Sequence, residues 1–230
     1  KIFFIPLIIH EQNTIPGTTN KLLSKFAKKS FQAFDNTFDN KVNATTTGNP
    51  ILFKPKSKNT PKLVQNLLVL GGSLGARRIN ETVVKIKTPL NIWHQTGAKN
   101  IEQVKVMYAK DVHPSLKIED FIEDMAEAYA WADIVICRSG AMTVSELIAT
   151  NTLAILVPFP YAVDNHQTMN AQYLSKNGAG ILIKESIFNE ELIDKEILAL
   201  NSEKLQEMTK NLELLSVPNP EMIIADYLFG

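Results

Sequence analysis

Three clusters of glycine, hydroxyl and carboxylate residues follow apolar runs that are typical of buried strands, at 71–75, 138–146 and 158–167. Parallel α/β sheets bind ligands at the carboxyl ends of their strands, so the three clusters are predicted to surround one crevice. They would supply backbone N–H groups for phosphate, a carboxylate for two sugar hydroxyls, and an amide side chain. Together they favour a nucleotide-sugar as the ligand.

The second cluster carries most of this chemistry. An apolar run at 133–137 predicts a strand, small residues follow it, and a helix is predicted to begin at 144–149. The free N–H groups at such a helix start can bind an anion. A purely structural alternative is a capping box, in which Thr143 caps the helix and Glu146 reaches back to the backbone N–H of Thr143. This stretch fits both interpretations.

The first cluster is a glycine loop between a predicted strand at 66–71 and a predicted helix at 76–84. Its three glycines, Gly71, Gly72 and Gly75, do not have the spacing of a dinucleotide-binding fingerprint. The loop also lacks the Gly-Lys-Ser/Thr ending of a Walker A motif. Close approach to a phosphate and a tight turn without a ligand are equally compatible with this spacing.

The order of strands and helices along the chain predicts an α/β fold. From residue 66 to residue 183, apolar runs alternate with helical stretches, which predicts a parallel sheet covered by helices on both faces. Upstream, a buried strand is predicted at 6–10 and a helix with a lysine-rich outer face at 20–31. The breaker triplet at 48–50 and the proline-punctuated segment at 53–61 indicate a domain junction.

Composition limits the classes of protein to which the chain can belong. Its 230 residues are 45% hydrophobic and 21% charged, which is typical of a soluble globular protein. With 24 basic and 24 acidic residues, the net charge of zero gives no reason to expect a nucleic-acid partner. No His, Cys or carboxylate cluster has the spacing of a metal site. The chain starts within an apolar segment and without Met, so we expect it to begin inside a domain.

Motifs spread along almost the whole chain resemble those of the MurG family of glycosyltransferases. The matching segments are 10–13, 48–50, 71–77, 93–97, 121–125, 130–133, 137–146 and 164–167, together with Asn80 and Asn170. The resemblance implies transfer of N-acetylglucosamine from UDP-N-acetylglucosamine (UDP-GlcNAc) to undecaprenyl-pyrophosphoryl-N-acetylmuramoyl-pentapeptide (lipid I). The product would be lipid II of peptidoglycan synthesis, formed with inversion at the anomeric carbon. No cofactor is implied, and a helix dipole would take the place of a metal ion.

The same resemblance implies the GT-B architecture, in which two Rossmann-like domains face a cleft. Residues 1–48 would be the tail of the N-terminal, acceptor-side domain, and residues 49–217 the C-terminal domain that binds UDP-GlcNAc. Residues 218–230 would form a helix that crosses back toward the first domain. Such an enzyme would lie peripherally on the cytoplasmic face of the bacterial inner membrane, held there through the remainder of its first domain.

The binding roles of the family transfer to matching positions of this sequence. Ser73 would lie near the diphosphate, the backbone of Ile122 would read the uracil, and Glu146 would accept hydrogen bonds from the ribose hydroxyls. Gln167 would hold the sugar hydroxyls. The full set implied for UDP-GlcNAc is Asn13, Ser73, Ile122, Ala141, Met142, Thr143, Val144, Ser145, Glu146 and Gln167. The set implied to support them is Asn20, Asn80, Arg138, Asp164 and Asn170.

Two departures from the family pattern affect these expectations. Relatives commonly have an arginine that helps to bind the donor at the position of Leu52. The glycine-rich segment with a histidine that opens the family's first domain has no counterpart, so the catalytic base is unassigned. His10 and Glu11 lie on the side of the cleft where a base would be needed. Two alternatives stay open: a fragment that binds the nucleotide-sugar without catalysis, and another GT-B enzyme of UDP-GlcNAc, such as a 2-epimerase.

Overall fold

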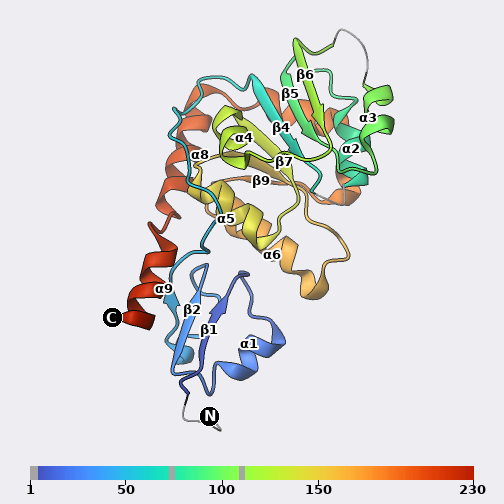
Figure 1. The fold of residues 1–230 in the computed structure, drawn as a ribbon. Helices are drawn as coiled ribbons and strands as arrows, with labels where there is room; N and C mark the ends of the chain where they lie inside the picture. The colour runs from blue at the N-terminus through green and yellow to red at the C-terminus, as the bar shows by residue number, and fades with distance from the viewer. Residues whose placement is uncertain (1–4, 73–75, 109–111) are drawn as a thin grey trace.

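The computed structural model describes residues 5–72, 76–108 and 112–230, which contain two parallel β-sheets. The larger sheet has six strands in the order β6-β5-β4-β7-β8-β9, and all of its neighbouring pairs are parallel (Figure 1). Its strands are β4 (Asn66–Leu70), β5 (Asn91–Gln95), β6 (Ser115–Glu119), β7 (Ile134–Cys137), β8 (Leu153–Leu156) and β9 (Ile181–Leu182). The predicted parallel α/β sheet is therefore confirmed.

The strand order of this sheet reverses between β4 and β7. From β4 the chain proceeds through β5 to β6 on one side, and it then returns to the other side of β4 to form β7, β8 and β9. Leu70 and Cys137, the last residues of β4 and β7, are paired in register. Ligands of open α/β sheets bind at such a switch point, beyond the carboxyl ends of the strands.

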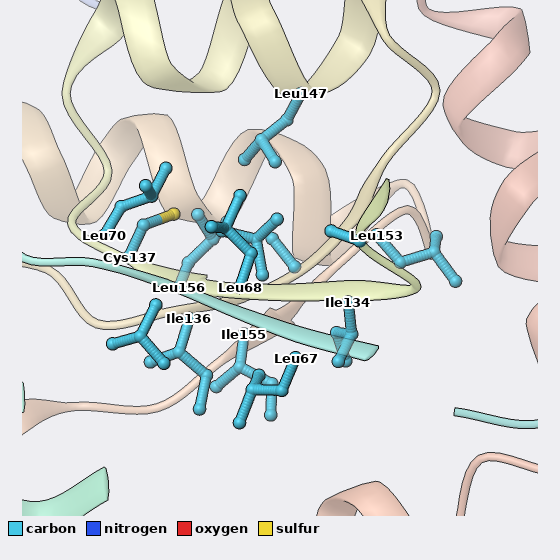
Figure 2. Packing of buried hydrophobic residues seen from close by; sticks show 14 of the residues in the cluster. Leu67, Leu68, Leu70, Ile134, Ile136, Cys137, Leu147, Leu153, Ile155 and Leu156 are labelled. Atoms are coloured by element: carbon cyan, nitrogen blue, oxygen red, sulfur yellow. The ribbon is translucent and has the colours of Figure 1, made fainter. Parts of the chain in front are cut away.

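The core of the larger domain lies on the two faces of this sheet. Successive side chains of a strand point to opposite faces, and in Figure 2 Leu68 and Cys137 point toward Leu147 of helix α5 whereas Ile136 and Ile155 point to the other face. All five of these side chains are at most 1% exposed. Burial on both faces explains why these strands are continuous apolar runs in the sequence.

Helices connect the strands and follow the last of them. They are α2 (Arg77–Val83), α3 (Ile101–Met107), α4 (Met125–Trp131), α5 (Ala141–Ala149), α6 (His166–Lys176), α7 (Glu190–Leu198), α8 (Ser202–Leu214) and α9 (Pro220–Phe229). Short 3₁₀ turns are η1 (Asn40–Val42), η2 (Val163–Asn165) and η3 (Glu185–Ile187). Asp124, Asn189 and Asn201 cap α4, α7 and α8 with side-chain oxygens that accept backbone N–H bonds.

The smaller sheet contains β1 (Ile8–Glu11), β2 (Lys29–Gln32) and β3 (Thr45–Thr46) in that order, with helix α1 (Thr18–Leu23) between the first two strands. The predicted helix at 20–31 is wrong beyond Leu23. The lysine-rich pattern fits a helix locally, but the chain turns back and pairs β2 with β1. This pairing leaves Phe31 1% exposed, so tertiary burial overrides the local preference.

The last helix returns to the smaller sheet (Figure 1). The ring of Tyr227 in α9 packs edge-on against Phe31 of β2, with 5.5 Å between ring centroids. Two connecting segments line one groove of about 610 Å³: 49–55, on the way from the smaller to the larger sheet, and 216–219, between α8 and α9. The chain passes so close to itself here that a Cβ on Gly48 would lie 3.6 Å from Cβ of Val217 and 3.2 Å from Cγ of Pro220. The predicted domain boundary at residue 48 falls between the two sheets.

Within the described residues, none of the helices has both the length and the apolar character needed to cross a membrane.

Candidate functional site

A cavity of about 280 Å³ opens at the switch point of the larger sheet. It lies beside Gly71 and Gly72, which directly follow β4, beside Cys137 at the end of β7, and beside the first turn of α5. Its wall combines apolar and polar side chains. The lining residues are Leu70, Gly71, Gly72, Gln95, Phe121, Ile122, Met125, Tyr129, Cys137, Arg138, Thr143 and Glu146. Of the residues implied for donor binding, Ile122, Thr143 and Glu146 meet here, with Arg138 from the supporting set.

Glu146 is the carboxylate of this cavity. Its Oε2 accepts a hydrogen bond of 2.9 Å from the hydroxyl of Tyr129. Burial raises the pKa of Glu146, and the bond from Tyr129 acts in the opposite direction. Its other oxygen, Oε1, forms no hydrogen bond with a described residue and is available to a ligand in the cavity.

The structural alternative, a capping box between Thr143 and Glu146, is not formed. Helix α5 begins at Ala141, three residues before the predicted start, and its N-cap is Gly140 with extended dihedral angles. No side chain caps this end. Thr143 is therefore already inside the helix, and Glu146 is free to bond with Tyr129. An uncapped helix start beside a cavity leaves backbone N–H groups and the positive end of the helix dipole for an anion.

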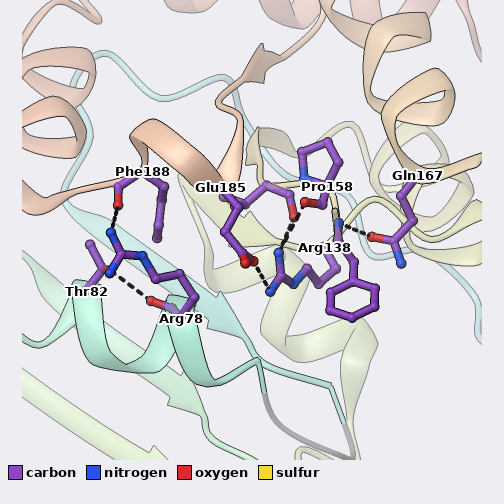
Figure 3. Close-up of polar contacts among 9 residues, drawn as sticks. Arg78, Thr82, Arg138, Pro158, Gln167, Glu185 and Phe188 are labelled. Carbon is purple, nitrogen blue, oxygen red and sulfur yellow. Dashed lines mark hydrogen bonds and ion pairs between the residues drawn. The ribbon is translucent and has the colours of Figure 1, made fainter. Parts of the chain in front are cut away.

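A second cavity of about 570 Å³ adjoins the first, because Gly71 and Arg138 line both. Arg138 pairs with Glu185 and donates to the carbonyls of Val157 and Pro158, as Figure 3 shows in part. Gln167 also lines this cavity, and its Oε1 accepts a 2.9 Å bond from the backbone N–H of Phe159. Arg138, implied as a supporting residue, and Gln167, implied for donor binding, therefore line the same cavity.

Several residues missed by the sequence analysis also shape the first cavity. Gln95 ends β5, and its Oε1 accepts a weak 3.4 Å bond from the backbone N–H of Ile122. Tyr129 lies in α4 and reaches Glu146 across 17 residues of sequence. A buried tyrosine needs a hydrogen-bond partner for its hydroxyl, and this requirement is the signal that could have indicated its role.

Other implied residues join the two sheets instead of lining the first cavity. Asn170 is completely buried, and its Oδ1 accepts bonds from the backbone N–H and hydroxyl of Thr14, at 3.0 and 2.9 Å. Its Nδ2 donates to Asn13 Oδ1 and to the carbonyl of Ser139. Ser145 accepts a 2.9 Å bond from Asn49, whose Nδ2 also donates to the carbonyl of Gln12. These bonds bring the loop after β1 to the start of α5.

The remaining implied residues have structural partners or lie elsewhere. Asn80 is buried between His94 and the carbonyl of Thr96, beside the backbone of Gly71. Asp164 is exposed in η2. Leu52, which replaces the arginine expected from relatives, is 99% exposed in the groove between the two connecting segments. Ser73 lies outside the described residues.

The contacts of the two candidate bases indicate a structural role. Nε2 of His10 lies 3.1 Å from the carbonyl of Gly48, and burial lowers the pKa of His10 despite that contact. Glu11 is 3% exposed and accepts bonds from the backbone N–H groups of Asn13 and Gly17 and from the side chain of Asn20. Burial alone would raise the pKa of Glu11, but these bonds outweigh it and lower the pKa.

Replacing Glu11 with glutamine is expected to destabilise the smaller sheet. The amide would turn a donor toward the donors that surround Glu11, which costs about 2 to 3 kcal/mol for a buried unmatched group. Hydrogen exchange of amides in residues 8–32 should become about 30-fold faster or more. Because the folded pKa of Glu11 is lowered, its contribution is present above the ordinary pKa of 4.5 and is lost as the pH falls below it.

The difference between Glu11→Gln and the wild type should therefore shrink below about pH 4. Glu102→Gln is a matched control, because the Glu102 side chain is 83% exposed and forms a surface ion pair with Lys105. Equal exchange rates in Glu11→Gln and the wild type would contradict the structural role of Glu11.

The described residues contain no group of three or more His, Cys, Asp or Glu side chains that could hold a metal ion.

Comparisons with known proteins agree with this geometry. Residues 66–221 match the model of the glycosyltransferase family 28 C-terminal domain, and residues 1–32 match that of the N-terminal domain. The crystal structure of Acinetobacter baumannii MurG superposes with a TM-score of 0.86 at 37% identity, over 98% of this chain and 68% of that one. The chain belongs to the MurG family of glycosyltransferase family 28. The α/β GT-B fold implied by the family resemblance is thereby confirmed.

Curated members of the MurG family are similar over nearly the whole chain. The protein of Vesicomyosocius okutanii subsp. Calyptogena okutanii is 50% identical over 99% of this chain, and that of Methylococcus capsulatus is 46% identical over 87%. Both are named UDP-N-acetylglucosamine--N-acetylmuramyl-(pentapeptide) pyrophosphoryl-undecaprenol N-acetylglucosamine transferases. This chain spans 65% and 58% of their lengths. The calicheamicin glycosyltransferase CalG4 shares the fold at 15% identity, with a TM-score of 0.58.

Proposed function

We propose that this chain binds UDP-GlcNAc and takes part in the transfer of N-acetylglucosamine to lipid I. The observation that carries the proposal is the cavity at the β4/β7 switch point, which is lined by Glu146 and by Thr143 from the first turn of the uncapped helix α5. A carboxylate accepts from vicinal ribose hydroxyls, and a helix start binds phosphate. The names of the curated relatives supply the sugar donor and the lipid-linked acceptor.

The two adjoining cavities suggest how UDP-GlcNAc would lie. The uracil would contact the backbone at Ile122, and the ribose hydroxyls would donate to Glu146 from the first cavity. The diphosphate would lie against the start of α5 near Ala141 and Met142. The sugar would extend into the second cavity, where Gln167 contributes an amide. In this pose the ligand passes from the first cavity to the second beside Gly71, which lines both.

The proposed transfer inverts the anomeric configuration. A base removes the proton from the C4 hydroxyl of the acceptor sugar, and its oxygen forms a bond to the anomeric carbon while the bond to the diphosphate breaks. Uridine diphosphate leaves with the bonding electron pair. The backbone N–H groups and dipole of α5 would stabilise the negative charge that develops on the diphosphate.

Donor binding without transfer is a second candidate function. The observation that favours it is the complete engagement of Glu11 by hydrogen bonds, together with the contacts of His10 to Thr47 and Gly48. The Glu11 carboxylate and Nε2 of His10 are thus held by other residues of the smaller sheet and its loops, which does not favour either group as a base. For the transfer function, a lipid-linked acceptor implies work at a membrane surface, and we propose the cytoplasmic face of the inner membrane as its location.

The donor assignment is tested by calorimetric titration of the chain with UDP-GlcNAc and UDP-glucose. We expect UDP-GlcNAc to bind at least about 10-fold more tightly, since a site that bonds the acetamido group leaves polar groups unpaired with glucose. Equal affinities would contradict the sugar assignment.

Transfer of labelled N-acetylglucosamine to a lipid I analogue separates the two functions, because turnover by this chain excludes binding alone.

A further inference from the structure

We propose that Tyr129 is a positioning residue that orients Glu146 and keeps it ionised for recognition of the ribose hydroxyls. This inference rests on the proposed function, in which Glu146 accepts hydrogen bonds from the ribose. It adds a role for a residue of α4, an element outside the glycine loop and the start of α5.

The direction of the bond between the two side chains is fixed by their chemistry. An ionised carboxylate can only accept, so the Tyr129 hydroxyl donates to Oε2 of Glu146 over 2.9 Å. Burial raises the pKa of Tyr129 well above its usual value, and the nearby charge of Glu146 adds to the rise. The phenol therefore keeps its proton throughout the physiological range. With Oε2 occupied, Oε1 is the oxygen left for the two ribose hydroxyls.

Tyr129 is held rigidly from several directions. It is 0% exposed, and its ring stacks on Phe53 with 5.9 Å between centroids and an interplanar angle of 22°. Its carbonyl accepts a 3.1 Å bond from Nζ of Lys58, which also donates to the carbonyl of Ala132 over 2.7 Å. These contacts fix the end of α4. The hydroxyl therefore reaches Glu146 from a position that does not depend on the ligand.

Glu146 needs such a donor because its surroundings disfavour charge. Burial raises its pKa, and the bond from Tyr129 is the contribution that lowers it. Of the other titratable groups near it, the Cys137 thiol is completely buried with a raised pKa and stays neutral. The guanidinium of Arg138 lines the same cavity but pairs with Glu185. Tyr129 is thus the residue that both aims Glu146 and favours its charged form.

The test compares UDP with 2′-deoxy-UDP, because their affinity ratio isolates the contribution of the hydroxyl and cancels that of the phosphates. We expect a ratio of about 10 or more for the wild type near pH 7.5 and of about 2 to 3 for Tyr129→Phe. Measured between pH 5 and pH 8, the ratio should fall as Glu146 becomes protonated. In Tyr129→Phe this fall should occur at a higher pH, because burial raises the pKa of Glu146 and the hydrogen bond from Tyr129 no longer lowers it.

Controls separate this inference from the proposed function. Glu146→Gln should have a low ratio at every pH, and adding Tyr129→Phe to it should change nothing further. Tyr173→Phe, which also removes a partly buried phenol from the larger domain, should retain the wild-type ratio and pH dependence. If the wild type binds UDP and 2′-deoxy-UDP equally well, or if Glu146→Gln keeps the wild-type preference for UDP, then the assignment of Glu146 to the ribose fails.

A second outcome overturns the role of Tyr129. In it, the wild type prefers UDP over 2′-deoxy-UDP in a way that depends on Glu146, but Tyr129→Phe keeps both the wild-type affinity ratio and the pH at which that ratio falls. Thermal unfolding reports whether each variant is folded. Should Tyr129→Phe not fold, the wild type still provides a test through the ¹³C NMR shift of the Tyr129 ring carbon that bears the hydroxyl. That shift should titrate at the same pH as the ribose preference, and a constant shift would overturn the inference.

Discussion

Replacing Glu146 with alanine is expected to weaken binding of UDP-GlcNAc by about 100-fold or more. The substitution removes two hydrogen bonds from ribose hydroxyls to a charged acceptor, each contributing about 1.5 to 3 kcal/mol, and every 1.4 kcal/mol corresponds to a factor of ten. It also leaves the buried hydroxyl of Tyr129 without its partner. Calorimetric titration at pH 7.5 measures the loss directly.

A carboxylate elsewhere on the same domain provides the control. Glu127 lies on α4, has a side chain that is 56% exposed, and pairs with Lys56 on the surface. Glu127→Ala should bind UDP-GlcNAc with wild-type affinity, because an exposed ion pair contributes little and does not line the cavity. An affinity of Glu146→Ala within twofold of the wild type would remove Glu146 from the site.

Replacing Gly71 with alanine is expected to lower both stability and donor affinity. A Cβ at this position would lie 2.9 Å from the backbone carbonyl of Gln95 and 3.1 Å from Oδ1 of Asn80. The backbone cannot yield as a flexible side chain can, so β4 and the loop after it must shift. Overpacking of this kind costs about 1 to 3 kcal/mol, which corresponds to a melting temperature lowered by about 2 to 12 °C.

Circular dichroism measures this melting temperature, and titration with UDP measures the accompanying loss of affinity. Gly17→Ala is the matched control, because Gly17 has an ordinary φ of −61° and the nearest atom to its added Cβ would be 3.9 Å away. A wild-type melting temperature for Gly71→Ala would show that the loop after β4 tolerates a side chain. It would then contradict the close packing of Gly71 against β5.

The sequence predicted the centre of the larger sheet well because the strands there are buried on both faces. The run 133–137 and the run 152–157 contain β7 (Ile134–Cys137) and β8 (Leu153–Leu156) with at most two extra residues, since burial on both faces requires an unbroken apolar segment. The strand β2 was not predicted, because its residues do not form an unbroken apolar run. Residues Lys29 to Gln32 form a strand because they pair with β1, and the sequence of these four residues alone does not indicate that pairing.

The candidate site was predictable where function imposes a local pattern and unpredictable where tertiary contact decides. Glu146, the carboxylate expected to face the ribose, lines the cavity, and the alternative contact from Glu146 back to the N–H of Thr143 is not formed. The Ser/Thr-x-x-Glu pattern occurs in many helices, and here Gly140 takes the N-cap position. The role of Tyr129 was not predicted, because its contact with Glu146 joins α4 to α5, two helices that β7 separates along the chain. Such a contact depends on the folded structure and not on a local pattern.

The adjacent segments 49–55 and 216–219 have a mechanical consequence. Two neighbouring covalent connections leave mainly one degree of freedom between the bodies that they join, a rotation about the axis that runs through both. Pro50 and Pro218 narrow that freedom further, because each fixes its own φ. Such a rotation would separate Asn13 from Asn170 while the cavity around Glu146, built within one body, keeps its shape. The residues that line this cavity would thus keep their positions relative to one another while the two sheets rotate apart.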